Sequence, residues 1–242
     1  MIRSWTKRAA VAAIVVGTAG TAWAAPIDLT APGTSATMAA VLAQPGPDAG
    51  KFIVFDKLFE ITAFSPAAGA PGAFQAANIT LTGRNNGFDG VGFRMFGQWA
   101  DLPGDANTFG FTIVYNATVL PSYAAQGVRI SGVNLAFNGA TSGVGSVASV
   151  DESVFDGQTL LGTARVESVD GNSPTLTNMI PVEPALVSVN VIKDFKVFSP
   201  SQTGFATTSF IEQTFKQVVP APGTGALAVV GLGLIARRRR QA

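Results

Sequence analysis

The amino-acid sequence predicts an all-β protein, built as a two-sheet antiparallel sandwich. Residues 25–217 contain no convincing stretch with the 3.6-residue apolar repeat of a helix; many short runs alternate or are rich in β-branched residues, and Gly, Pro, Asn, Asp and Ser separate them. Charged residues are only 13% of the 242 residues, so the chain can bury a core. We expect one sandwich domain over 51–217, preceded by an irregular lead-in over 25–50 with a short strand near 37–42.

Nine runs are the predicted strands of this domain. The run at 128–137 changes its apolar phase from even to odd positions, which predicts a β-bulge at Ser131 and Gly132. The nine runs cover residues 51–61, 76–82, 91–99, 109–115, 128–137, 144–150, 158–169, 186–198 and 206–215.

Alternation is clearest in the runs at 91–99 and 109–115, whose apolar sides should meet in one core. The first of these places Val91, Phe93, Met95 and Trp99 on one face and Arg94 and Gln98 on the other.

Three aromatic residues are candidates for a platform that stacks on a sugar ring: Trp99, Tyr115 and Tyr123. Trp99 and Tyr115 are in phase with core residues, so we expect them to be buried, whereas Tyr123 follows a proline in a loop-like stretch and is the most exposed candidate.

Lys193 lies among apolar neighbours in the run at 186–198. It either reaches solvent from a strand end, which we favour, or pairs with a carboxylate.

The composition excludes several kinds of chemistry. The chain has no cysteine and no histidine, which removes disulfides, thiolate metal sites and the commonest general base. Three of the sixteen basic residues lie in the first 24 residues and four near the C-terminus, which leaves nine basic against fifteen acidic residues and a net charge of −6. We expect no nucleic-acid partner, no cofactor and no enzymatic activity.

Polar clusters offer alternatives that we weigh against ordinary turns. The stretches at 85–90 and 101–107 contain Asn and Asp residues that could hold Ca²⁺, but neither has EF-hand spacing, and Asn-Gly or Asp-Gly pairs are typical of tight turns. Asp151 and Glu152, followed by Asp156, are predicted to form a solvated turn rather than a catalytic carboxylate pair. We therefore expect no metal site and no catalytic residue.

Residues 1–24 are predicted to be a secretory signal peptide with a signal helix. Three basic residues come first, an apolar stretch follows over 9–16, and small residues end the segment at Ala22 and Ala24, with cleavage expected after Ala24. A buried or amphipathic N-terminal helix is the alternative. The mature chain should therefore lie outside the cytoplasm.

Residues 218–242 are predicted to form a membrane tail. Val219, Pro220, Ala221 and Pro222 precede an apolar run over 225–236, and four arginines follow. The prolines end the preceding structure, and the positive-inside rule keeps the arginines on the cytoplasmic side. Twelve helical residues span about 18 Å, less than the hydrocarbon core of about 30 Å, so the transmembrane helix is short. The residues that stop transfer are Arg237, Arg238, Arg239 and Arg240.

This tail resembles the PEP-CTERM sorting signal, over about the last 24 residues. The resemblance rests on Pro220, Ala221 and Pro222, the short helix and the closing arginine cluster; Ala221 stands where the family usually has Glu. It implies that the inner membrane holds the tail in transit and that an exosortase removes it. Signal peptidase and an exosortase are then partners. An ordinary unprocessed anchor is the alternative.

The middle of the chain is similar to the jelly-roll or lectin-like sandwiches of many PEP-CTERM surface proteins, on the runs at 188–194 and 209–215. We expect an exported bacterial cell-surface or extracellular-matrix protein of structural or interaction type. The alternative is a carbohydrate-binding module that contacts extracellular polysaccharide. A groove lined by exposed aromatic residues would favour that alternative, whereas featureless Thr, Ser and Asn faces would favour a scaffold.

Overall fold

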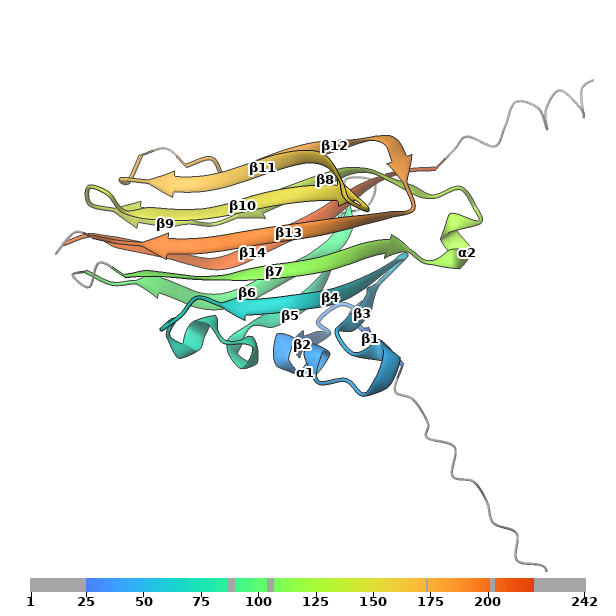
Figure 1. The fold of residues 1–242 in the computed structure, drawn as a ribbon, viewed down its shortest axis with the longest axis horizontal. Coiled ribbons are helices and arrows are strands. Elements are labelled where there is room, and N and C mark those ends of the chain that lie inside the picture. Colours follow the sequence, from blue (N-terminus) through green and yellow to red (C-terminus); the bar gives the residue numbers. More distant parts are fainter. Residues whose placement is uncertain (1–24, 87–89, 104–106, 173, 201–202, 220–242) are drawn as a thin grey trace, which may run out of the picture.

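The computed structural model describes residues 25–86, 90–103, 107–172, 174–200 and 203–219. In this part the chain forms two sheets packed face to face, which confirms the predicted sandwich (Figure 1). The predicted signal helix over 1–24 and the sorting helix beyond Val219 lie outside the described residues. Within the described part, no helix has the length and apolar character needed to cross a bilayer.

Sheet A has the strand order β1–β3–β4–β7–β13–β10–β11. Its neighbouring strands are antiparallel except β1 and β3, which pair in parallel. The crossover that a parallel pair needs is the stretch between them, which contributes β2 to the other sheet. The prediction of a wholly antiparallel sandwich is therefore wrong at this edge. The bounds are β1 Ile27–Asp28, β3 Lys51–Val54, β4 Lys57–Pro66, β7 Thr108–Val119, β10 Val147–Asp156, β11 Thr159–Val169 and β13 Ser188–Phe198.

Sheet B has the order β12–β8–β14–β6–β5–β2, with β9 also paired to β14. Short helices also lie in the connections between the described strands. The strands are β2 Ser35–Thr37, β5 Thr80–Asn85, β6 Val91–Asp101, β8 Arg129–Phe137, β9 Ala140–Ser142, β12 Thr177–Leu186 and β14 Phe205–Val218; the helices are α1 Met38–Leu42, η1 Gly46–Asp48, η2 Gly72–Phe74, η3 Ala76–Asn78 and α2 Pro121–Ala124.

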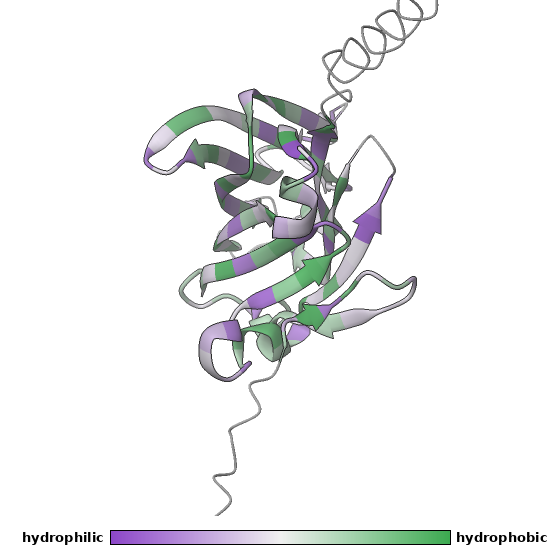
Figure 2. Cartoon of the chain, turned by 90° about the vertical axis from the view of Figure 1, so that its right-hand side faces the viewer, coloured by the Kyte–Doolittle hydropathy of each residue, from purple (hydrophilic) through white to green (hydrophobic). Residues whose placement is uncertain are grey.

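Aromatic contacts join the inner faces of the two sheets. The ring centroids of Phe59 in β4 and Phe93 in β6 are 5.1 Å apart, and the same distance separates Trp99 in β6 from Phe195 in β13. Trp99 and Tyr115 are both fully buried, as predicted. Apolar and polar residues alternate along the strands in Figure 2, because only one face of each sheet meets the core.

The predicted bulge in β8 is confirmed. Gly132 pairs with Lys216 and Ile130 with Gln217, so Ser131 is an extra residue relative to β14. The bulge restores the inward phase, and both Ile130 and Val133 are buried.

Several expectations about element type are wrong. The strand expected near 37–42 is helix α1, because the Thr37 hydroxyl accepts a hydrogen bond from the Ala40 amide at 3.1 Å and caps a helical turn. The lead-in also contributes β1 and β2 to the sheets. Strand β12 was not predicted; it contains Pro181 and Pro184, which an edge strand tolerates because one side of its backbone pairs with no neighbour.

The acidic cluster at 151–156 lies on strand β10, and the predicted solvated turn is wrong. Asp151 and Glu152 point to opposite faces, as adjacent strand residues must, and Glu152 is 2% exposed. Its cross-strand partner in the register of β10 and β13 is Lys193.

Lys193 is fully buried and donates a hydrogen bond to Glu152, so the favoured expectation of a snorkelling lysine is wrong and the carboxylate pair is confirmed. Lys193 lies in the middle of β13, on the same face as the buried residues Val191 and Phe195. Burial lowers the pKa of Lys193, against the opposing effect of Glu152. Burial, helped by the negative charge of Glu152, raises the pKa of the neighbouring Tyr115 phenol well above its ordinary 10.0.

Candidate functional site

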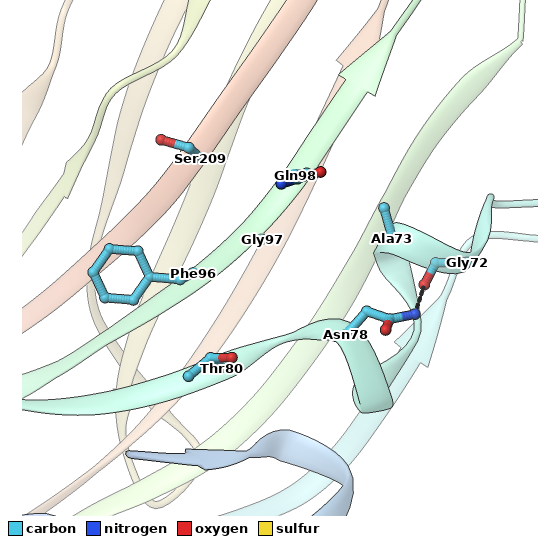
Figure 3. Close-up of a pocket in the computed structure, with 8 residues that line it drawn as sticks. All are labelled: Gly72, Ala73, Asn78, Thr80, Phe96, Gly97, Gln98 and Ser209. Carbon is cyan, nitrogen blue, oxygen red and sulfur yellow. Dashed lines mark hydrogen bonds between the residues drawn. The ribbon is translucent and has the colours of Figure 1, made fainter. Parts of the chain in front are cut away.

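An open groove lies at the outer face of sheet B, where β5, β6 and β14 are neighbours and η2 and η3 form a wall (Figure 3). Its volume is about 640 Å³. None of the described residues that line the groove carries a charge, so they offer amides, hydroxyls and one aromatic ring. The lining residues are Gly72, Ala73, Asn78, Thr80, Phe96, Gly97, Gln98 and Ser209.

A β-bulge in β6 forms the floor of the groove, since Gly97 and Gln98 together lie opposite Ser209 of β14. Gly97 faces inward, toward Trp99. A Cβ atom on Gly97 would lie 2.3 Å from the indole ring, so only glycine lets the Trp99 ring pack directly beneath the floor. The floor is therefore supported by the core.

Hydrogen bonds fix helix η2 as the wall. The indole N–H of Trp99 donates to the backbone carbonyl of Ala73 at 3.1 Å, and the Asn78 side-chain amide donates to the carbonyl of Gly72 at 2.7 Å (Figure 3). The first bond ties the wall to β6 and the second ties it to η3. Helix η2 is thus tied by one bond to the sheet and by the other to its neighbouring helix.

The rim on β14 is held by Asn138, which follows β8. Its Oδ1 accepts hydrogen bonds from the backbone amides of Ser209 and Phe210, at 3.0 and 2.9 Å, and from the Thr208 hydroxyl at 2.9 Å. Its Nδ2 donates to the Ser209 hydroxyl at 2.7 Å. One side chain therefore satisfies the backbone where β14 departs from regular pairing.

Phe96 presents an aromatic ring beside the groove and is 36% exposed. Its centroid is 6.5 Å from that of Phe210, its cross-strand partner on the same outer face. The guanidinium carbon of Arg94 lies 4.2 Å from the Phe210 centroid and 5.5 Å from the Phe96 centroid, so the cation covers part of this aromatic pair. Arg94 also donates to Glu212.

The aromatic residues singled out in the sequence lie elsewhere. Tyr123 is exposed, at 40%, as expected, but it is in α2 and lines a separate pocket with Gln126 and Gln217. Trp99 does not line the groove; its buried ring packs under Gly97 on the core side. Phe96 was not predicted as a site residue, although its position offered a signal: it is the one aromatic residue in the polar phase of the run that contains Phe93 and Trp99.

Among the residues that the structure describes, no three acidic side chains gather into a group that could hold a metal ion. Asp101 ends β6 as a buried residue and accepts the backbone N–H of Ser199 at 2.6 Å. Asp89 and Asp105, which the calcium alternative would need, lie outside the described residues.

The predicted sorting residues fall almost wholly outside the described part. These are Ala22 and Ala24 near the N-terminus, and Pro220, Ala221, Pro222, Arg237, Arg238, Arg239 and Arg240 near the C-terminus. Val219 is described; it is exposed and directly follows the end of β14.

No family model matches this chain, and no curated protein matches it. Among solved structures, TmCBM61 in complex with β-1,4-galactotriose is 12% identical, with a TM-score of 0.30, over 72% of this chain and 97% of that one. The carbohydrate-binding module CBM36, in complex with calcium and xylotriose, is 22% identical with a TM-score of 0.25, over 63% and 99%. Tailspike protein 4 of bacteriophage CBA120 is 12% identical with a TM-score of 0.29, over 63% and 19%. At these TM-scores the similarity identifies no ligand for this chain.

Proposed function

We propose that this protein is an exported cell-surface protein that binds polysaccharide through the groove on sheet B. The observation that carries the proposal is the exposed ring of Phe96, set among the amides of Asn78 and Gln98 and the hydroxyls of Thr80 and Ser209. An aromatic ring packs against the apolar face of a sugar, and amides and hydroxyls exchange hydrogen bonds with its hydroxyl groups.

Of the two functions that the sequence leaves open, the groove favours carbohydrate binding over a purely structural role. The outer face of sheet B is not a featureless surface of small polar residues, because it combines an aromatic pair with a groove. The uncharged lining favours binding over catalysis, since it offers no carboxylate to act as an acid, base or nucleophile.

The Phe96→Ala variant should bind polysaccharide about tenfold or more weakly than the wild type, because it loses the aromatic ring that lines the groove. Affinity electrophoresis through gels that contain galactan, xylan, alginate or polygalacturonate measures this loss. Ile192→Ala is the matched control: Ile192 is similarly exposed, at 39%, but lies on sheet A. Equal binding by Phe96→Ala and the wild type would contradict the proposal, and absence of binding to every polymer would favour a scaffold.

The export part of the proposal rests on the signal-like segment at 1–24 and the PEP-CTERM-like tail. Removal of both segments would leave an acidic surface domain whose last strand, β14, ends just before the sorting motif. We expect the protein recovered from the cell surface to have an intact mass that lacks Met1 and the cluster Arg237 to Arg240. Retention of either end on most molecules would contradict processing at that end.

A further inference from the structure

The outer face of sheet B continues past the groove as rows of cross-strand neighbours. One row pairs Phe96 with Phe210, and the next pairs Arg94 with Glu212. Residues two apart on a strand lie about 6.6 Å apart on the same face, so Arg94 is the direct neighbour of Phe96 on this surface. The aromatic site and the charged row therefore form one continuous surface.

Two arginines on this surface share a single carboxylate. Arg84 donates through Nε to Oε2 of Glu212 at 3.0 Å, and Arg94 donates to that same oxygen through Nε at 2.7 Å and through a terminal nitrogen. Among the described residues, Glu212 is the only acidic partner of either arginine. The trio carries a net charge of +1, and the Arg84 side chain is 36% exposed.

This positive charge is local, since the exported part of the chain carries −6. The strands of sheet B contain four basic and three acidic residues, and one of those acids, Asp101, is buried. On the outer face of sheet A the charges of the corresponding cluster cancel. Arg165 lies between Asp151 and Glu167, at 3.1 and 2.6 Å, and Lys196 also contacts Asp151. A surplus cation therefore accompanies the aromatic site.

We propose that the ligand of the groove is a polysaccharide that carries carboxylate groups, with Arg84 and Arg94 selecting for its charge; this inference rests on the proposed function. A sugar stacked near Phe96 would bring the carboxylate of a neighbouring residue to the two guanidinium groups. Arginine presents paired donors that match a carboxylate, and Arg94 is already held in place by Glu212 and the Phe210 ring. Arg84 is the more exposed of the two and is the residue whose loss should change selectivity.

The test compares polygalacturonate and alginate with the same two polymers after methyl esterification, which removes the charge and keeps the sugar backbone. The purified wild-type protein should bind each free acid about two- to fivefold more tightly than its ester, the range expected for one exposed ion pair. That preference should shrink as the salt concentration rises, because salt screens exposed charges.

The Arg84→Gln variant should lose this preference while its affinity for the esters stays unchanged. Arg165→Gln is the matched control, since it removes the same charge from sheet A and should leave the preference intact. Equal binding of acid and ester by the wild type would overturn the inference, as would an equal loss for both forms in Arg84→Gln. If neutral galactan binds through Phe96 and the acidic polymers bind no more tightly than their esters, the proposal of polysaccharide binding is supported and the proposal of acid selectivity is wrong. If no polymer binds, both proposals are wrong.

Discussion

The Glu152→Gln variant should lose about 3–5 kcal/mol of unfolding free energy, because it leaves the Lys193 ammonium buried without an opposite charge. Both side chains of the pair are fully buried in the wild type. Burial already lowers the pKa of Lys193, and loss of Glu152 removes the effect that opposes it. A lysine pKa below its ordinary 10.5 means that the unfolded chain binds more protons, so the loss should shrink as the pH rises toward 10.5.

Denaturant unfolding at several pH values measures this effect. The double variant Lys193→Met with Glu152→Leu is the control, because it replaces the pair by apolar groups; it should recover most of the lost stability. A Glu152→Gln variant within about 1 kcal/mol of the wild type at neutral pH would contradict the account of a desolvated pair.

The Trp99→Ala variant should also lose about 3–5 kcal/mol, because a large fully buried ring is removed from between the sheets. It should weaken polysaccharide binding as well, since the ring supports Gly97 and its N–H holds the carbonyl of Ala73. Thermal unfolding and affinity electrophoresis measure the two effects.

Trp99→Phe separates the packing role of Trp99 from its hydrogen bond. It keeps an aromatic ring but loses the N–H, so it should cost about 1 kcal/mol in stability and still weaken binding. If Trp99→Phe binds polysaccharide like the wild type, the hydrogen bond to Ala73 does not position the groove wall.

Local patterns were sufficient for much of the fold. Strand β6 was predictable because Val91, Phe93 and Met95 share one phase, and the bulge at Ser131 was predictable because the phase of β8 changes there. Helix α1 and edge strand β12 were not predictable. A five-residue helix is too short to show a helical repeat, and the prolines in β12 are atypical of a strand.

Contacts between distant segments were not predictable from those patterns. Glu152 is 41 residues from Lys193, and nothing near either residue specifies their pairing. The groove likewise brings η2, β6 and β14 together, and Ser209 lies more than a hundred positions from Gly97. Phe96 could have been recognised as an outward-facing aromatic residue, but its hydrogen-bonding neighbours depend on the order of strands in sheet B.

We propose that polysaccharide binds on the outer face of sheet B. Nuclear magnetic resonance titration of the isotope-labelled protein with oligosaccharides from a polymer that binds tests it most directly, because each backbone amide reports its own surroundings. We expect the signals of Phe96, Gln98 and Ser209 to shift with ligand, while those of Ile192 and Asp194 on the outer face of sheet A stay fixed. Shifts centred on sheet A, or around Tyr123 in α2, with none at Phe96, would contradict it.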